Sequence, residues 1–215
     1  NNTIVEQWAV WWRYRRNIGI SFDTKCAIFG GQKVVPIDQK KPPFWRHNKD
    51  LNQIYFSVYH LSESNIKSYL DDLYKLNVEW IHGYPSSLVI LAQYIISRGV
   101  DYSGKIKYIT TGSENLLEHQ KILISKAFGI NPTQHYGLAE GVANISENSN
   151  HKLVVDEDFS AVEFVNIENH GLHIIGSTLT NFAMPLLRYD TKDIVRVKDE
   201  QFYMKYPRII DSIDG

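Results

Sequence analysis

The sequence is poor in cysteine: Cys26 is the only one among its 215 residues. One thiol excludes an internal disulfide and any metal site built from several thiolates, and such scarcity is typical of proteins in a reducing cytoplasm. No stretch approaches the roughly 18 consecutive apolar residues of a membrane-spanning helix, and the N-terminal NNTIVEQWAVWW lacks the regions of a secretory signal. We therefore expect a cytoplasmic protein without a membrane span.

An excess of charge of either sign is also lacking. The 23 basic and 24 acidic side chains leave a formal net charge of −1, which gives no strong field to attract nucleic acid or an anionic membrane. The signatures of P-loop NTPases, dinucleotide-binding folds, zinc proteases and serine hydrolases are absent as well, so these classes lose support. We expect small-molecule partners rather than nucleic acid, and the oligomeric state is left open.

What the chain does contain is a regular alternation of strand and helix patterns. β-rich segments end in the loops HGYPSS, TTGSEN and HYGLAEG, and helical patterns separate them. Strands that alternate with helices of about 12 residues predict an α/β fold with a parallel, Rossmann-like sheet flanked by helices. After residue 150 the pattern alternates without a helical face, which predicts an antiparallel β-barrel-like lobe.

These patterns divide the chain into three expected parts. Residues 1–50 form a helix and an irregular connection that belong to a truncated N-terminal part. Residues 51–148 form the α/β subdomain with the loops, and residues 149–215 form the β-rich subdomain. Both ends of the sequence look cut, so we expect a fragment of a longer protein. The first helix is expected to pack one face into the core, made of Val5, Trp8 and Trp12.

The three loops are predicted at the carboxyl edge of the parallel sheet, where such folds bind their ligands. In TTGSEN, Gly112 lets the backbone approach a flat ligand, and Ser113 and Glu114 precede a helix. In HYGLAEG, the ring of Tyr136 offers a face on which a base stacks, worth about 1–3 kcal/mol. Glu140 is a carboxylate of the kind that holds magnesium together with phosphates. Each loop alone is equally compatible with an ordinary turn.

A further motif, MPLLRYDTKDIV, lies in the β-rich part. Arg188 and Asp193 flank a tyrosine there. A carboxylate at the start of a strand accepts two hydrogen bonds from a ribose diol, a geometry that a neutral side chain matches poorly. The alternative is a surface β-turn that carries a salt bridge.

Taken in order, three of these stretches resemble motifs of the adenylate-forming superfamily of acyl-CoA synthetases, peptide-synthetase adenylation domains and luciferases. TTGSE resembles its adenine-loop motif, YGLAE its Y-G-x-[TS]-E motif, and RYDTKD its Y-R-T-G-D motif. The segment MPLLRYDTKD is most similar to the corresponding segment of the phenylacetate–CoA ligase-like branch. PPFWR, YHLS and GYPSSL resemble the capsular-polysaccharide-biosynthesis members of that branch, so the resemblance runs from about Gly30 to Gly215.

The resemblance implies a role for individual residues. Tyr136 would stack on adenine, Asp193 would hold the ribose hydroxyls, and Glu140 would bind Mg²⁺ as a catalytic residue. His60 would be a second catalytic residue, a gate near the acyl carbonyl. The nucleotide site would comprise Gly112, Ser113, Glu114, Tyr136, Gly137, Arg188 and Asp193, and the carboxylate-substrate pocket would comprise Tyr84, Pro85 and Ala139.

The sequence also departs from the family pattern. Ala139 stands where the family prefers Thr or Ser, and Asp190 and Lys192 replace residues of Y-R-T-G-D. A Ser/Thr/Gly-rich phosphate loop is expected upstream of Trp8, and Gly215 is expected at the hinge to a C-terminal lid that carries a catalytic lysine. Neither is found in the sequence, so we expect weak nucleotide binding and no pyrophosphate release from this chain.

The function implied is that of the central part of an ATP-dependent ligase. It would activate a carboxylic acid as an acyl-AMP with ATP and Mg²⁺, for transfer to CoA or another acceptor, in polysaccharide biosynthesis for capsule-type members. Two alternatives stay open: a catalytically incomplete nucleotide-binding or scaffold domain, and a nucleotidyltransferase that adenylates a cofactor alcohol. We expect Glu114, Tyr136, Glu140 and Asp193 to line a single cleft between the two lobes.

Overall fold

The computed structural model describes residues 2–168, 170–197 and 205–214. The chain divides into two compact units. We call Ile20–Gln134 the α/β unit, and Asn1–Gly19 together with His135–Gly215 the β unit. The hinge expected at Gly215 lies outside the described residues, and the three-part division at residues 50 and 148 stays a prediction.

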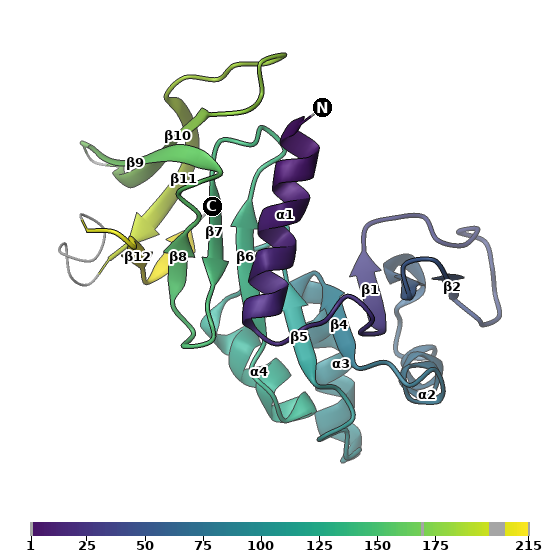
Figure 1. Cartoon of the computed structure of the whole chain (residues 1–215). Helices are drawn as coiled ribbons and strands as arrows, with labels where there is room; N and C mark the ends of the chain where they lie inside the picture. The colour runs from purple at the N-terminus through teal and green to yellow at the C-terminus, as the bar shows by residue number, and fades with distance from the viewer. Residues whose placement is uncertain (1, 169, 198–204, 215) are drawn as a thin grey trace. The chain divides into compact units, whose positions relative to one another are not determined.

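The α/β unit contains the parallel sheet that the alternating pattern predicts (Figure 1). Its strands are β1 (Cys26–Gly30), β2 (Trp45–Asn48), β3 (Gln53–Ser57), β4 (Trp80–Gly83), β5 (Tyr108–Thr111) and the start of β6 (Thr133–Gly137). Parallel pairing joins β3, β1, β4, β5 and β6 in that order. Strand β2 departs from it as an antiparallel edge strand on β3, because only four residues separate the two strands.

Helices connect the parallel strands and share one hydrophobic core with them. They are α2 (Ile66–Lys75), α3 (Pro85–Arg98) and α4 (Glu118–Phe128), with a short 3₁₀ turn at Val58–His60. Helix α3 begins with Pro85 and ends at Gly99, whose left-handed φ of 61° stops the helix. Phe29 of β1 stacks on Phe56 of β3 with ring centroids 4.9 Å apart, which fixes the centre of this core.

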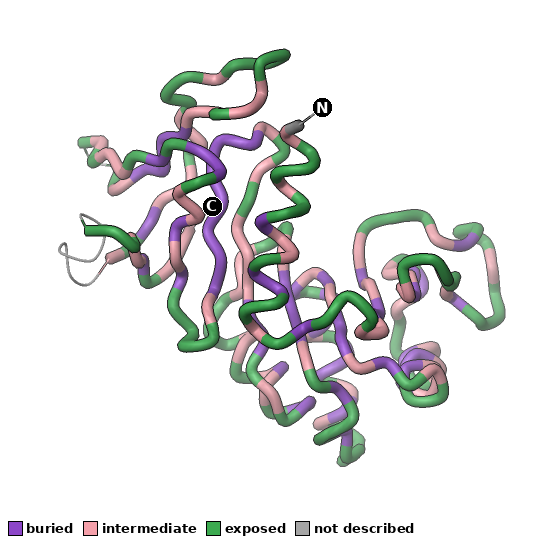
Figure 2. The backbone as a smooth tube through the Cα atoms, in the orientation of Figure 1, coloured by how far each residue is buried: buried purple, intermediate pink, exposed green. Residues whose placement is uncertain are grey.

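In the β unit, antiparallel strands follow the end of β6. They are β7 (Asn144–Glu147), β8 (Leu153–Val155) and β12 (Ile209–Ile210). Antiparallel pairing therefore begins at His135, earlier than the change of pattern near residue 150 suggests. The reason is that β7 is only four residues long and buried along its whole length, so it shows no alternation (Figure 2).

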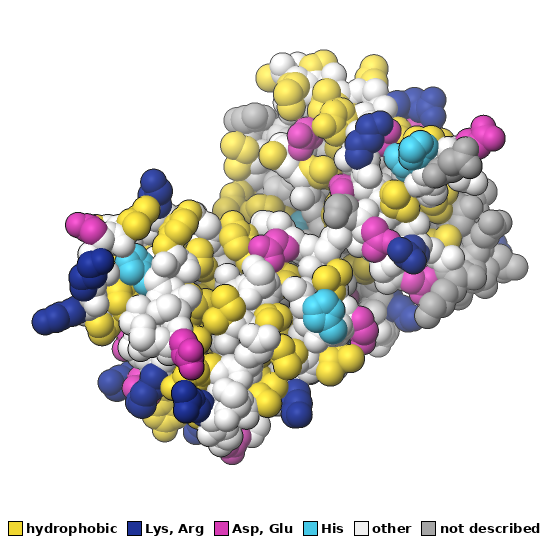
Figure 3. All heavy atoms as spheres, turned by 180° about the vertical axis from the view of Figure 1, so that it is seen from behind, with side chains coloured by type: hydrophobic (Ala, Val, Ile, Leu, Met, Phe, Trp, Pro, Cys, Tyr) yellow, Lys and Arg dark blue, Asp and Glu magenta, His cyan; other side chains and the backbone are white. Residues whose placement is uncertain are grey.

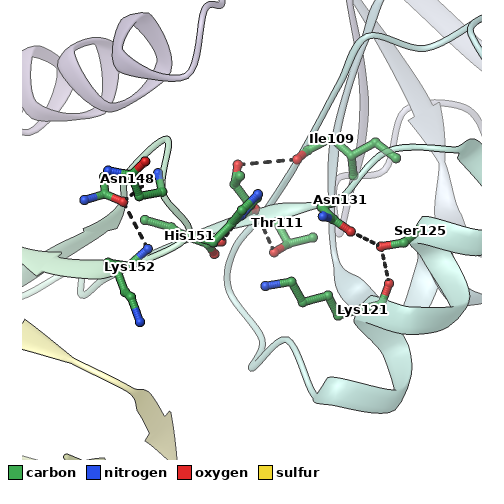
Figure 4. A network of polar contacts seen from close by, with 11 residues as sticks. Ile109, Thr111, Lys121, Ser125, Asn131, Asn148, His151 and Lys152 are labelled. Atoms are coloured by element: carbon green, nitrogen blue, oxygen red, sulfur yellow. Dashed lines mark hydrogen bonds and ion pairs between the residues drawn. The ribbon is translucent and has the colours of Figure 1, made fainter.

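The turn between β7 and β8 is closed by a side chain. The Asn148 Oδ1 atom accepts hydrogen bonds from the backbone N–H groups of Asn150 at 2.9 Å and Lys152 at 3.0 Å (Figure 4). His151 takes a positive φ of 57° in the same turn. A short amide side chain that bonds the backbone two residues ahead is what makes asparagine a turn former.

A separate four-stranded antiparallel sheet completes the β unit and confirms the predicted antiparallel lobe. Its strands are β9 (Ser160–Ile167), β10 (Gly171–Thr178), β11 (Tyr189–Arg196) and β13 (Ser212–Asp214), in the order β13-β11-β10-β9. The described residues after 155 contain no helix. The inward side chains of the four-stranded sheet join those of β7 and β8 in a second core that includes Ile145, Val162 and Ile174.

Helix α1 (Asn2–Asn17) belongs to the β unit and corrects one expectation. Val5 is 68% exposed and Trp8 is 45% exposed, so the face expected in the core is largely outward. The buried face is the one that carries Val10 and Tyr14. Tryptophans on several sides of the helix hid the correct face from a periodicity argument, and polar contacts mark it instead.

The contacts of α1 are polar and aromatic. The Gln7 Nε2 atom donates a hydrogen bond to Asn144 Oδ1 at 3.1 Å. Trp11 meets His135 edge-on with ring centroids 5.8 Å apart. Arg13 forms ion pairs with Asp156 and Asp158 at 2.9 and 2.5 Å. These contacts dock the helix against the start of the antiparallel strands.

Helices in the described part of the chain are too short or too polar to cross a membrane. Figure 3 shows basic and acidic side chains interspersed on one face, with hydrophobic side chains between them.

The packing of Gly176 in β10 gives a test of the β-unit core. A Cβ atom there would lie 2.1 Å from the carbonyl oxygen of Val142, a backbone atom that cannot rotate away. We expect Gly176→Ala to lower the free energy of unfolding by about 1–3 kcal/mol in urea denaturation, as overpacking does.

The control is Gly30→Ala, because a Cβ atom at Gly30 would meet only Ile28 at 3.9 Å. It should change stability by about 0.5 kcal/mol or less. Equal effects of the two substitutions would contradict the close packing of β10.

Candidate functional site

The carboxyl ends of β1, β4 and β5 meet around a cavity of about 190 Å³ in the α/β unit. This is the edge at which parallel sheets bind ligands. No side chain that carries a full charge lines the cavity in the described α/β unit, and its inner wall is made by aromatic and aliphatic side chains. Residues from the strand ends include Gly30, Gly31, His82, Tyr84, Gly112 and Ser113. The structure thus brings Tyr84 together with Gly112 and Ser113.

Glu114 joins two of the loops. Its carboxylate accepts hydrogen bonds from the backbone N–H of Ser86 at 3.0 Å and from the Ser86 hydroxyl at 2.9 Å. Ser86 lies in the first turn of α3, directly after Pro85, where free N–H groups and the helix dipole favour a carboxylate. Ser113 before it has a φ of 63°, a conformation rare for a residue with a side chain. Glu114 therefore fixes the geometry of TTGSE against GYPSS.

His60 lies in a buried network of polar contacts. The ring is 8% exposed and stacks on Phe44 at 4.8 Å. Its Nε2 atom lies 3.1 Å from the carbonyl oxygen of Ile37, which can only accept, so Nε2 carries the proton. Its Nδ1 atom then accepts the hydroxyl proton of Ser57 at 2.8 Å. Both nitrogens have protein partners, which explains the position of His60 structurally; its role as an acyl gate stays a prediction.

In the β unit, Tyr136 and Asp193 form a direct hydrogen bond. The Tyr136 hydroxyl on β6 donates to Asp193 Oδ2 on β11 at 2.5 Å. Burial raises the pKa of Tyr136 far above its usual range, and the hydrogen bond to Asp193 and the charge of Glu140 raise that pKa further. The phenol thus stays protonated and donates, and two of the predicted nucleotide residues, Tyr136 and Asp193, are in direct contact.

Glu140 lies in the turn after β6. The N–H of Gly141 donates to the carbonyl of Leu138 at 3.1 Å, and Gly141 takes a φ of 67°. Ala139 is exposed at the tip of this turn. Gly137, the other glycine of the motif, is required by close packing, because a Cβ atom at this position would lie 2.4 Å from Asn144 Oδ1. In the described part of the chain, no three His, Cys, Asp or Glu side chains gather to hold a metal ion.

Asp193 is presented by an irregularity in the sheet. The pairing of β10 with β11 shifts between His173 and Ile175, so residues 191–193 face the single residue Ile174. The Thr191 hydroxyl bonds the Ile174 carbonyl at 3.0 Å. Such bulges re-aim side chains and are frequent beside active sites. The side chains that hold this bulge, His173 and Asp190, were not among the predicted site residues, because their pairing depends on strand register.

Arg188 is in contact with β9. Its Nε atom donates to Glu163 Oε1 at 3.0 Å in an exposed ion pair, and its backbone N–H bonds the Ser177 hydroxyl at 2.8 Å. An exposed ion pair at Arg188 is compatible with the alternative, a surface turn that carries a salt bridge. A contact of Arg188 with a nucleotide stays a prediction.

The predicted nucleotide residues fall into two groups by compact unit. Gly112, Ser113 and Glu114 belong to the α/β unit, whereas Tyr136 and Asp193 belong to the β unit with Glu140 and Gly137. Each group is brought together within its own unit. That one nucleotide contacts both groups stays a prediction.

Comparison with known proteins adds a sequence relative. The chain is 32% identical to Protein CapK of Staphylococcus aureus over 187 residues, which cover 87% of this chain and 42% of CapK. No protein-family model matches the sequence. The chain therefore spans less than half the length of this relative.

The fold is similar to that of solved ligases. 2-Hydroxyisobutyryl-CoA ligase, solved with 2-HIB-AMP and CoA, matches with a TM-score of 0.66 and 14% identity over 96% of this chain and 48% of that one. Coronafacic acid ligase from Pectobacterium brasiliense matches with a TM-score of 0.52 and 14% identity over 94% and 41%.

The chain has the adenylate-forming ligase fold. This is the fold that the resemblance implied, and the identity of 14% limits the structural likeness to the fold. The hydrogen bonds of Glu114 and Tyr136 can be tested through the free energy of unfolding.

We expect Glu114→Ala to lower the free energy of unfolding by about 1 kcal/mol, the usual cost of a lost helix cap. The reason is that the first turn of α3 loses both acceptors of Ser86. Thermal denaturation of Glu114→Ala, Ser86→Ala and the double variant measures it, with Glu6→Ala on the exposed face of α1 as the control. The double variant should lose no more than Glu114→Ala; additive losses would show that the two side chains act separately.

We expect Tyr136→Phe to lower the free energy of unfolding by about 1.5–3 kcal/mol at neutral pH, because the Asp193 carboxylate loses a half-buried hydrogen-bond donor. The raised pKa sets the pH dependence. The stability that protonated Tyr136 contributes is complete below the pKa of about 10 that tyrosine has in the unfolded chain. It is lost as the pH rises toward the higher pKa of Tyr136 in the folded chain.

Urea denaturation between pH 9 and 11.5 checks the sign. Above pH ~10 the stability of the native chain should fall more steeply than that of Tyr136→Phe, by up to about 1.4 kcal/mol per pH unit. The other buried tyrosines are common to both proteins and cancel in the difference. Parallel curves would show that Tyr136 is not buried against Asp193.

Proposed function

We propose that this chain is the nucleotide-binding central part of an ATP-dependent ligase that activates a carboxylic acid as an acyl-AMP. The acyl group then passes to CoA or to another acceptor. The fold and the three motifs in order support this proposal, and the observation that carries it is the hydrogen bond between Tyr136 and Asp193, with Glu140 in the turn that follows Tyr136 on β6. An aromatic ring, a ribose acceptor and a metal carboxylate are the groups that Mg·ATP needs.

Each of the three residues has a distinct task in this proposal. The ring of Tyr136 stacks on adenine, which needs only a π-face. Asp193 accepts the ribose hydroxyls with the lone pairs that Tyr136 leaves free, since a carboxylate accepts about four hydrogen bonds. Glu140 supplies one carboxylate to Mg²⁺, and this suffices because magnesium takes one or two carboxylates and completes its shell with water and phosphates.

The cavity of the α/β unit suits the carboxylic acid. Its volume of about 190 Å³ and its uncharged lining favour a compact, uncharged acyl group. For scale, an engineered apolar cavity of about 150 Å³ binds benzene. Tyr84 and Pro85 would border the acid, and Gly112 and Ser113 line the same cavity. In the related fold of 2-hydroxyisobutyryl-CoA ligase, the bound acyl group is also small, as the name of its ligand states.

The relative CapK links the proposal to capsular polysaccharide biosynthesis. In that setting the activated acid would modify a sugar, with CoA as an intermediate carrier or without it. The lone, buried Cys26 agrees with work in the reducing cytoplasm.

One observation favours a second candidate, a nucleotide-binding domain without turnover. Ala139 is exposed in the turn beside Glu140, at the position where the family has a hydroxyl, so that contact with magnesium or phosphate is missing. Restoring the hydroxyl with Ala139→Thr tests the metal assignment in either candidate, because it should strengthen Mg·ATP binding only where Glu140 holds a metal.

Calorimetric titration with AMP and with Mg·ATP tests the proposal. We expect dissociation constants on the order of millimolar, which correspond to about −4 kcal/mol. Tyr136→Ala should weaken the binding of both ligands, because both contain adenine. Glu140→Gln should leave AMP binding unchanged and weaken Mg·ATP binding by about tenfold, because only Mg·ATP requires the metal carboxylate.

The matched control is Glu6→Gln, an exposed glutamate of the same unit, which should affect neither ligand. Equal losses of AMP and Mg·ATP in Glu140→Gln would remove Glu140 as the metal ligand. Unchanged AMP binding in Tyr136→Ala would remove the adenine assignment.

A further inference from the structure

We propose that Asp190, supported by His173, is a positioning residue that holds the β11 bulge in the conformation in which Asp193 faces the ribose. This inference rests on the proposed function, and it concerns two residues that the motifs did not select. Asp190 stands at the position where the Y-R-T-G-D pattern has arginine. It stabilises the backbone conformation of Lys192, which stands where the pattern has glycine.

The bulge contains a strained residue. Lys192 has a φ of 69°, in the left-handed region that costs a residue with a side chain about 1–2 kcal/mol. The family pattern has glycine at this position, and glycine enters that region without a steric penalty. Lysine in the same place needs outside contacts to keep the conformation.

Asp190 supplies those contacts from within the bulge. Its Oδ1 atom accepts the backbone N–H of Lys192 at 3.0 Å, and its Oδ2 atom accepts the Lys192 ammonium at 2.6 Å. One carboxylate thus holds both ends of the strained residue. Asp193, the next residue, is held within the same bulge, since its backbone N–H donates to the Thr191 hydroxyl at 3.1 Å.

His173 holds the carboxylate in turn. Its Nδ1 atom lies 3.0 Å from Asp190 Oδ1, and an ionised carboxylate only accepts, so Nδ1 donates. The ring is 6% exposed, and its Nε2 atom is buried without a hydrogen-bond partner among the described residues. Leaving a buried nitrogen without a partner costs free energy, and the contact with Asp190 compensates part of that cost.

A structural role alone does not explain where this network lies. The bulge is the point at which β11 leaves the register of β10, and the residue that it turns is the partner of Tyr136. A sheet that needed only stability would pair residues 190–193 regularly. The contacts of Asp190 therefore maintain the direction of the Asp193 carboxylate.

Discrimination between two nucleotides tests this role. Calorimetry compares AMP with 2′,3′-dideoxyadenosine monophosphate, which lacks both ribose hydroxyls. The native chain should prefer AMP by about tenfold, the worth of one charge-assisted hydrogen bond. Asp190→Ala should reduce this preference to about one- to twofold and leave the affinity for the dideoxy ligand unchanged, because only the ribose contact is misplaced.

The decisive variant combines Asp190→Ala with Lys192→Gly. Glycine holds the positive φ without help, so the preference for AMP should return to near its native value. Asp214→Ala on β13 removes an exposed ion pair with Arg196 of β11 and serves as the control, with no change expected. If Asp190→Ala does not fold, His173→Asn takes its place and should reduce the preference in the same direction.

The outcomes separate this inference from the proposed function. A native chain that binds both nucleotides equally overturns the ribose assignment of Asp193, and the inference with it. A native preference that Asp190→Ala leaves intact overturns the inference alone. A preference that is lost and does not return with Lys192→Gly shows that Asp190 contacts the nucleotide itself, which also contradicts a positioning role.

Discussion

The hydrogen bond from the Tyr136 hydroxyl to the Asp193 carboxylate is the contact on which the account of the β unit depends. It joins the end of β6 to the bulge of β11, two segments 57 residues apart in the sequence. Because the phenol is half-buried and its pKa is raised, it stays protonated near neutral pH and donates to Asp193. The carboxylate is therefore oriented before any ligand arrives, which is the preorganisation that a binding site needs.

Backbone strain in the site follows from the same requirement. Ser113, Arg188 and Lys192 all take positive φ values, and all three lie in stretches that resemble family motifs. Strain of this kind persists only where surrounding contacts hold it, and it gathers at functional sites. Near Lys192 those contacts come from Asp190, and the loop of Ser113 is held by the contacts of Glu114 with α3. In both places a carboxylate bonded to backbone N–H groups fixes a loop.

Much of the fold could be predicted from the sequence, because strands and helices differ in the period at which their hydrophobic residues recur. Turn chemistry identified α3 as well, through Pro85 and Gly99. The face of α1 was wrong, because its tryptophans point in several directions and the docking contacts are polar. His173 and Asp190 could not be found, because their contact arises from a register shift between β10 and β11 that no local pattern encodes. The motif residues Tyr136 and Asp193 were selected through family resemblance, whereas their hydrogen bond to each other is visible only in the structure.

The central claim is that the cluster around Tyr136 binds an adenine nucleotide, and photolabelling tests it most directly. Irradiation of the chain with 8-azidoadenosine monophosphate, followed by peptide mass spectrometry, locates the base without relying on affinity. The account predicts that the label is found on the peptide that contains Tyr136 and that excess AMP removes it. A label that AMP displaces from a different peptide, with the Tyr136 peptide unmodified, would contradict the account.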